Sequence, residues 1–180
     1  MARCAKRRAA AAPAAARENR FLTQDGKPIV NLIQVEEGEK VTAILPVREF
    51  SADRYIFMAT ALGTVKKTPL TDFSRPRAAG IIAVNLDEGD HLVGVALTDG
   101  KQDIMLFSDA GKALRFAEDE VRAMGRNAGG VRGMRLPEGG QVISLLTAAD
   151  ENVSVLTATE NGYGKRTPIG DYTKHGRGTQ

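Results

Sequence analysis

Hydrophobic residues beyond Lys27 come in short runs separated by polar turns, and this pattern predicts β-strands. Each run has seven to nine residues and is rich in Val, Ile, Leu and Thr. Polar turns such as EFSADR and DGKQ bound the runs, as β-hairpins require. The runs cover residues 41–47, 55–62, 91–98, 103–109, 141–148 and 152–160. Further strands are expected at residues 28–35, 80–86 and 130–136, and one helical turn within residues 117–125. The pattern therefore predicts an all-β fold.

Two glycine markers repeat along the chain with a period of about fifty residues. The first precedes a strand with basic residues and lies at Gly63, Gly111 and Gly162, at intervals of 48 and 51 residues. The second lies in a polar turn at Gly38, Gly89 and Gly139, at intervals of 51 and 50 residues. Two independent markers that keep one period are hard to obtain by accident. A period of this length built from short β segments is typical of propeller blades.

The period predicts about three four-stranded blades within a domain at residues 27–180, with repeats at 41–91, 92–141 and 142–180. Closed propellers usually have about four to eight blades, so the three repeats are expected to be a piece of a larger ring. Residues 1–26 are rich in Ala and Arg, and Pro13 interrupts them. This composition predicts a disordered leader.

Charge is distributed unevenly along the chain. The net charge of +3 hides a first stretch of twenty residues with a net charge of +5, while the other 160 residues carry −2. Within the repeats, acidic residues cluster at the turn of the second glycine marker, and basic residues follow the first. The basic residues are Lys66, Lys67, Lys112, Arg115, Lys165 and Arg166.

Radial blades would place these basic residues on one belt, and the regular anionic backbone of duplex DNA could follow such a belt. The alternative is that the charged residues only solvate the outer strands. Neither catalysis nor metal binding is indicated by the sequence. His91 and His175 have no partner at metal-ligand spacing, and none of the common catalytic motifs is present. The segment GYGKRTP lacks the glycine and the Ser or Thr of a phosphate loop. No apolar run approaches the roughly 20 residues that a membrane span needs.

Three segments closely resemble the C-terminal domain of DNA gyrase A subunits. They are FMATALGTVKKTPLTDFSR, DIMLFSDAGKALRFAEDEVRAMGRNAGGVRGMRL and LTATENGYGKRTPIGDY. The resemblance extends from about Lys27 to about Thr173 and implies a β-pinwheel, a propeller-like ring whose blades exchange strands and whose basic rim wraps DNA. It implies that the six basic strand residues lie on that rim. The arginines Arg122, Arg126 and Arg132 are further candidates for DNA contact. The Q-R-R-G-G-K-G box of the family is absent.

The resemblance further implies a part of a type II topoisomerase that supports ATP-dependent negative supercoiling by the full enzyme and contributes DNA binding rather than chemistry. ATP and Mg²⁺ would be used elsewhere in the intact enzyme, and no cofactor is expected in this chain. The expected partners are double-stranded DNA, the remainder of the gyrase A protein and the gyrase B protein, in the cytoplasm of a bacterium and associated with its chromosome. Two alternatives stay open, namely the matching domain of topoisomerase IV and a protein-interaction propeller without a DNA role.

Overall fold

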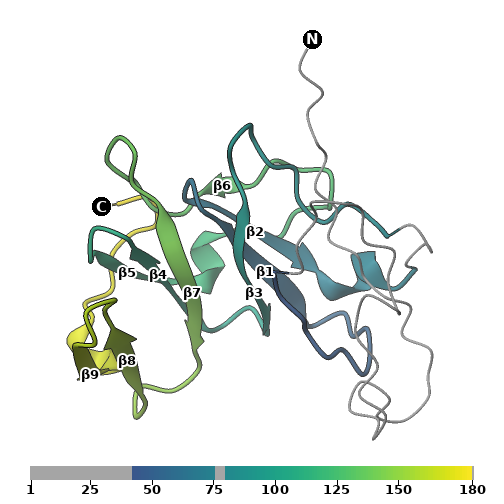
Figure 1. Cartoon of the computed structure of the whole chain (residues 1–180). Helices are drawn as coiled ribbons and strands as arrows, with labels where there is room; N and C mark the ends of the chain where they lie inside the picture. Colours follow the sequence, from purple (N-terminus) through teal and green to yellow (C-terminus); the bar gives the residue numbers. More distant parts are fainter. Residues whose placement is uncertain (1–41, 76–79, 180) are drawn as a thin grey trace, which may run out of the picture.

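The computed structural model describes residues 42–75 and 80–179, which form three antiparallel sheets and three short 3₁₀ turns (Figure 1). The strands are β1 (Tyr55–Thr60), β2 (Thr64–Pro69), β3 (Leu92–Thr98), β4 (Asp103–Ser108), β5 (Ala113–Ala117), β6 (Val131–Arg132), β7 (Val142–Ala148), β8 (Ser154–Ala158) and β9 (Gly164–Pro168). The 3₁₀ turns are η3 (Leu70–Phe73), η4 (Glu118–Glu120) and η5 (Ile169–Asp171). The predicted all-β fold class is confirmed.

The same hairpin occurs three times, as β1–β2, β4–β5 and β8–β9. The first glycine marker lies at the tip of each hairpin, and all three marker glycines have φ between 74° and 83°, the left-handed region that other residues avoid. A 3₁₀ turn follows the second strand of each hairpin. The helical turn predicted within residues 117–125 is therefore present as η4. Its counterparts η3 and η5 follow Pro69 and Pro168, whose fixed φ suits the start of a helical turn.

Sheets are completed by strands from further along the chain. The first sheet has the strand order β3-β1-β2-β6, so the β1–β2 hairpin lies between β3 and β6. Strand β6 belongs to the second repeat but pairs with β2 of the first. The second sheet has the order β5-β4-β7, and the third consists of β8 and β9. This exchange confirms the pinwheel architecture that the resemblance implies, since consecutive blades share strands.

Two predicted strands form no ladder with the described residues. Residues 42–47 and 80–86 belong to no strand among the described residues, although Leu45 and Val84 pack into a hydrophobic cluster with Met58 and Leu70. The third predicted strand at 130–136 is reduced to β6, two residues long. The apolar pattern therefore identified burial at residues 80–86 but not at Ile44, which is 62% exposed, and it overestimated pairing in both segments. The leader at 1–26 and the strand predicted at 28–35 lie outside the described residues.

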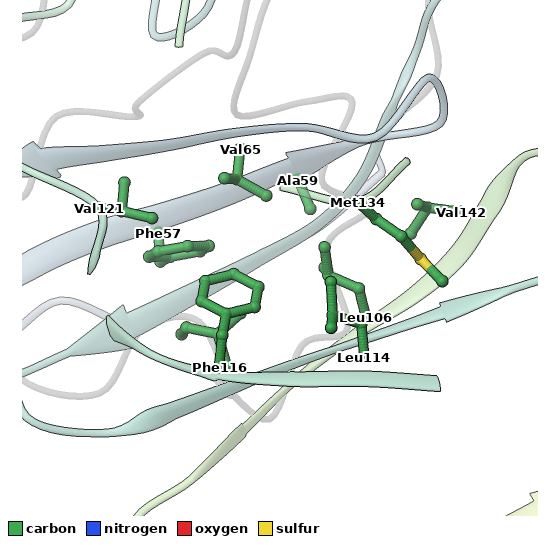
Figure 2. Close-up of a cluster of buried hydrophobic side chains, with 10 residues drawn as sticks. Phe57, Ala59, Val65, Leu106, Leu114, Phe116, Val121, Met134 and Val142 are labelled. Carbon is green, nitrogen blue, oxygen red and sulfur yellow. The ribbon is translucent and has the colours of Figure 1, made fainter. Parts of the chain in front are cut away.

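Hydrophobic cores lie between successive blades. The core between the first two sheets consists of ten buried residues, most of which Figure 2 labels. Its members are Phe57, Ala59, Val65, Ile104, Leu106, Leu114, Phe116, Val121, Met134 and Val142. A smaller core joins the second and third hairpins through Met105, Val155 and Ile169. The middle hairpin is thus apolar on both faces, because it packs between two neighbours.

The two larger sheets approach each other at β3 and β7, which Figure 1 shows side by side. At Gly94 of β3 an added Cβ would lie only 2.8 Å from Leu145 Cβ of β7. Strands β3 and β7 are therefore the inner edges of the sheets, and β2 and β5 lie toward the outer edges. None of the described elements is a helix of the length and apolar character that crossing a membrane demands.

Candidate nucleic-acid interface

The six basic strand residues occupy three different positions in the hairpin register. One position lies four residues after the marker glycine and is basic in all three repeats, as Lys67, Arg115 and Arg166. The strand pairings confirm the equivalence, because these residues lie opposite Phe57, Met105 and Leu156. The position before it holds Lys66, Leu114 and Lys165, and Lys112 corresponds to Thr64 and Tyr163. A single belt of six equivalent cations is therefore not formed.

Lys67 is buried, with 6% of its surface exposed. Its Nζ donates to the backbone oxygen of Glu118 at 3.1 Å, and the Glu118 carboxylate lies 3.9 Å away. The ammonium also lies 5.2 Å from the centre of the Tyr55 ring, a cation–π contact. Since Glu118 opens η4 of the second repeat, Lys67 joins the first blade to the second.

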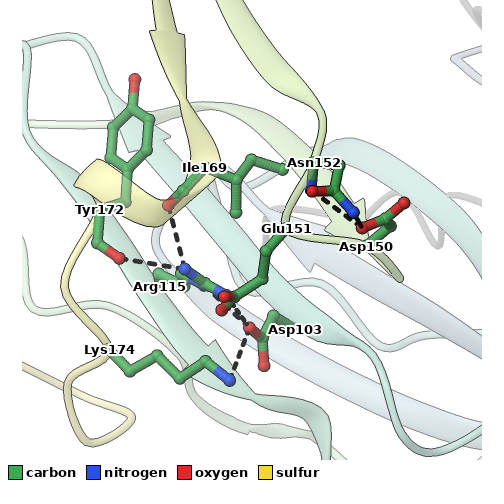
Figure 3. Close-up of polar contacts among 8 residues, drawn as sticks. All are labelled: Asp103, Arg115, Asp150, Glu151, Asn152, Ile169, Tyr172 and Lys174. Carbon is green, nitrogen blue, oxygen red and sulfur yellow. Dashed lines mark hydrogen bonds and ion pairs between the residues drawn. The ribbon is translucent and has the colours of Figure 1, made fainter.

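Arg115 joins the second blade to the third in the same way (Figure 3), and only 3% of its surface is exposed. Its Nη1 donates to the backbone oxygen of Ile169 at 3.0 Å, and Ile169 opens η5. The guanidinium also contacts the carboxylates of Asp103 at 2.5 Å and Glu151 at 2.6 Å. Burial disfavours the charged form, but hydrogen bonds to Glu151 and Asp103 and the charges of both carboxylates together outweigh it and raise the pKa of Arg115.

Lys66 is fully buried on the opposite face of β2. Its Nζ donates to the backbone oxygen of Ala83 at 2.9 Å and to that of Arg126. Burial, with a smaller contribution from the Arg126 charge, lowers the pKa of Lys66 to about 8. The Asp72 carboxylate opposes this shift. Lys66 thus holds the segments of Ala83 and Arg126 against β2 by two hydrogen bonds, and the Asp72 carboxylate compensates its charge only in part.

We expect this charge to make stability depend on pH above neutrality. The pKa of Lys66 is about 8 in the folded chain and 10.5 in the unfolded chain, so the unfolded chain binds more protons between these two pH values. The contribution of Lys66 to the free energy of unfolding should therefore rise from pH 8 to pH 10.5. Below this window the full cost of burying the charge remains. Urea titrations across this range should show the stability of the parent chain rising with pH relative to that of Lys66→Met, and a constant difference between the two would contradict the assignment.

The expectation that Lys66, Lys67 and Arg115 lie on an exposed rim is wrong. Each is buried, and its charge is satisfied by backbone carbonyls or carboxylates. The physical reason is that strands of a blade are covered by neighbouring blades and loops. A signal was present in the sequence, since Asp103 and Glu118 lie at the ends of apolar runs, at 104–107 and 116–117, where a buried carboxylate could partner a buried cation. By contrast, Lys112, Lys165, Arg166, Arg122 and Arg132 are exposed, and Arg126 is half-buried.

A second basic feature recurs in the loops that follow the 3₁₀ turns. Residues 121–128 and 172–179 are equivalent, and each runs along the outer edge of the preceding blade. Ala123 forms a parallel bridge with Lys67, and Lys174 forms one with Arg115. Each loop carries a Gly-Arg pair, at Arg126 and Arg177. We name these two segments the outer loops.

The arginines of the outer loops make the same contact, 51 residues apart. Arg126 Nη1 donates to the backbone oxygen of Ile82 at 3.4 Å, and Arg177 Nη1 donates to that of Arg132 at 2.6 Å. Ile82 and Arg132 are themselves equivalent positions, two residues after a glycine. The Arg177 backbone N–H also donates to the Glu120 carboxylate at 2.7 Å. A cation is therefore fixed at the same place on consecutive blades.

The outer loops and β6 together place a series of arginines along one edge. Arg122 and Arg132 lie along the same outer edge of β2, because the loop at Ala123 and strand β6 both pair with that edge. Arg177 extends the series to the next blade through its contact with Arg132. Arg177 belongs to the basic residues that recur in the loops of the sequence, although it is not among the DNA-contact candidates that the resemblance implies. A row of arginines along one edge can follow an extended polyanion.

Consecutive hairpin blades that exchange strands and carry cations along the outer edge define a propeller-type repeat domain with a cationic rim. The sequence matches the family described as DNA gyrase C-terminal domain, beta-propeller, at residues 25–48, 54–99, 102–149 and 154–180. The chain belongs to this family.

Known relatives agree with this assignment. The chain is 59% identical over 155 residues to the gyrase A protein of Klebsiella oxytoca and 54% identical to that of Escherichia coli (strain K12). Each alignment covers 86% of this chain and 18% of the relative, so the chain spans under a fifth of their length.

Solved structures show the same fold. A structure of a DNA gyrase A C-terminal domain matches with a TM-score of 0.77 and 29% identity, covering 89% of this chain and 53% of the other. The C-terminal domain of a DNA topoisomerase IV matches with a TM-score of 0.80 and 32% identity, covering 86% and 48%. The names of the curated relatives favour gyrase over topoisomerase IV.

Proposed function

We propose that this chain binds and wraps duplex DNA as part of a gyrase A protein, and that its outer loops form the contact surface. Membership in the gyrase C-terminal family supports a role with DNA. The observation that carries the proposal is the equivalent placement of Arg126 and Arg177, which make one contact on two consecutive blades. A duplex that crosses successive blades would meet the same cationic group at each step.

The chemistry of this contact is electrostatic. Arginine side chains bind phosphate oxygens with charge-assisted hydrogen bonds, and release of condensed counterions supplies the affinity. Such contacts position DNA without reading its sequence. Exposed Arg122 and Arg132 are the residues of the edge that are best placed to reach phosphates. Lys112 and Lys165 lie near the hairpin tips and would add contacts at the margin of the track.

In the whole enzyme the wrapped duplex would be presented for strand passage. The remainder of the gyrase A protein and the gyrase B protein would supply DNA cleavage and ATP hydrolysis, with Mg²⁺, so this chain would act without a cofactor and would not be an enzyme on its own. That enzyme would work in the bacterial cytoplasm on the chromosome.

Neutralising the cationic edge should weaken DNA binding. We expect the double variant Arg122→Gln/Arg132→Gln to lower the slope of log affinity against log salt by about 2, because each lost phosphate contact removes about one counterion. Affinity at moderate salt should fall by about ten- to hundredfold. Fluorescence anisotropy with a labelled duplex at several salt concentrations measures both quantities.

The matched control for this experiment is Arg48→Gln, which removes an exposed arginine charge that belongs neither to the outer loops nor to β6. It should leave the salt slope almost unchanged. Equal losses per charge for the control and the double variant would show that binding depends only on net charge, and the edge would then have no special role.

A second candidate is the corresponding domain of topoisomerase IV, favoured by the slightly higher TM-score and identity of that structure. Ligation of nicked plasmid with the chain bound distinguishes the two. Gyrase-type wrapping should trap a change in linking number, whereas binding without wrapping leaves the topoisomer distribution centred as in free DNA.

A further inference from the structure

The two outer loops are held against their neighbouring segments in different ways. In the second outer loop (172–179) the Gly178 N–H donates directly to the backbone oxygen of Gly133 at 2.7 Å. Ala83 is the residue equivalent to Gly133 in the preceding repeat. Its backbone oxygen accepts a hydrogen bond from the Lys66 ammonium at 2.9 Å instead. At the first outer loop (121–128), a lysine side chain therefore takes the place of a backbone donor.

Lys66 also contacts the first outer loop itself. The same Nζ donates to the backbone oxygen of Arg126, so two carbonyls that can only accept share one ammonium with three N–H groups. Two further bonds join the loop to residues 80–86, from Arg126 Nη1 to the Ile82 oxygen at 3.4 Å and from Asn85 Nδ2 to the Asn127 oxygen at 3.1 Å. Both are longer than the bond from Lys66 to Ala83, and the second is exposed to water. Lys66 is therefore the buried anchor of the loop at Arg126.

The sheet itself does not need a cation at this position. Leu114 occupies the equivalent position of the second repeat and is buried in the core between the first two sheets. It lies opposite Leu106, as Lys66 lies opposite Met58. Burying a charge costs free energy that burying a leucine does not. The lysine is therefore explained by the loop that it holds rather than by packing within the blade.

We propose that Lys66 is a positioning residue for DNA, which holds the backbone of Arg126 and so keeps the first outer loop in the arrangement that meets the phosphates. This inference rests on the proposed function, because it concerns the geometry of the same cationic edge. Lys66 is fully buried, so it acts through the loop rather than by touching DNA. The second outer loop is independent of such a lysine, since the Gly178 N–H makes the corresponding bond.

DNA binding by Lys66→Met tests this role in the full chain. The substitution keeps a long side chain in the core and removes the ammonium that the two carbonyls share. We expect the affinity for a labelled duplex at neutral pH to fall about three- to tenfold, the scale of one lost phosphate contact. Leu114→Met, at the equivalent buried position of the next blade, should leave the affinity unchanged. An affinity equal to that of the parent chain, or a fall no larger than that of Arg48→Gln, would overturn the proposal.

The pH dependence of binding separates this role from a general loss of structure. The charged groups that act on Lys66 are Asp72 of η3 and Arg126, and residues 80–86 carry no charge. Phosphates at the loop favour the charged lysine, so bound DNA should raise the pKa of Lys66 above its value of about 8 in the free chain. The complex then binds more protons, and the ratio of parent to Lys66→Met affinity should fall as the pH rises above about 8. A constant ratio would contradict the proposal, because DNA would then be indifferent to the group that holds the loop.

Hydrogen exchange examines the loop without DNA. The Met124 N–H of the first outer loop donates to the Lys67 oxygen at 2.8 Å, and the His175 N–H of the second donates to the Arg115 oxygen at 2.8 Å. Lys66→Met should speed exchange at Met124 and leave His175 unchanged, and an unchanged rate at Met124 would overturn the proposal.

The two proposals can fail separately. A parent chain that binds no duplex would overturn the proposed function. Loss of affinity in Arg122→Gln/Arg132→Gln without loss in Lys66→Met would overturn only the role of Lys66.

Discussion

Replacing Arg115 by Met is expected to lower the free energy of unfolding by about 3–5 kcal/mol, the usual cost of removing one partner from a buried ion pair. The substitution keeps a long apolar side chain. It leaves the buried Asp103 carboxylate without the guanidinium, and it removes the hydrogen bond to the backbone oxygen of Ile169. Lys174, 2.9 Å from Asp103, can offset only part of this loss because it is half-exposed. Urea denaturation of the two proteins measures the difference.

Two controls make this prediction specific. Arg122→Met removes an exposed arginine and should change the free energy of unfolding by less than about 0.5 kcal/mol. The double variant Arg115→Met/Asp103→Asn should recover part of the loss, because it removes the unpaired carboxylate. A loss below about 1 kcal/mol for Arg115→Met would mean that the joint between the second and third blades does not depend on this residue.

Gly63→Ala is expected to cost about 3 kcal/mol, from two separate causes. Gly63 has φ of 83°, and an added Cβ would lie 2.7 Å from the backbone oxygen of Met134. The backbone oxygen of Gly63 also accepts hydrogen bonds from Gly133 at 2.7 Å and Met134 at 3.2 Å. The tip of the first hairpin therefore cannot move away from the clash without breaking these bonds. Thermal or urea unfolding of the variant measures the loss.

The equivalent glycine of the next repeat separates the two causes. Gly111 has φ of 74°, but nothing lies within 4 Å of its Cβ position. Gly111→Ala should therefore cost only the backbone strain, about 1–2 kcal/mol. Equal losses at the two glycines would show that packing against Met134 does not constrain the first hairpin tip.

The repeats, the hairpins and the fold class could be predicted from the sequence, because they depend on local properties. The alternation of apolar and polar residues has the period of a strand, and the marker glycines supply the left-handed turns. Pairing of residues 42–47 and 80–86 could not be predicted in this way. Ile81 and Val84 are buried by packing although their segment pairs with no described strand, because an apolar pattern reports burial rather than hydrogen bonding.

The candidate site was predicted less well, for a related reason. A lysine or arginine on a strand looks the same in sequence whether water or a neighbouring blade covers it. Lys67 and Arg115 are satisfied by Glu118 and Ile169, which lie 51 and 54 residues further along the chain. Only the packing of one blade on the next brings these groups within hydrogen-bonding distance.

The sequence by itself determined that this protein consists of repeated β-hairpins of one family and that cations recur in them. The tertiary structure decided which cations are available to a ligand. Stacking buries Lys66, Lys67 and Arg115 and turns their charges toward carbonyls and carboxylates of neighbouring segments. The same stacking places Arg122 and Arg132 at the outer edge. The physical reason is that burying a charge costs free energy unless a partner is supplied, and the partners come from a different repeat or from a distant loop.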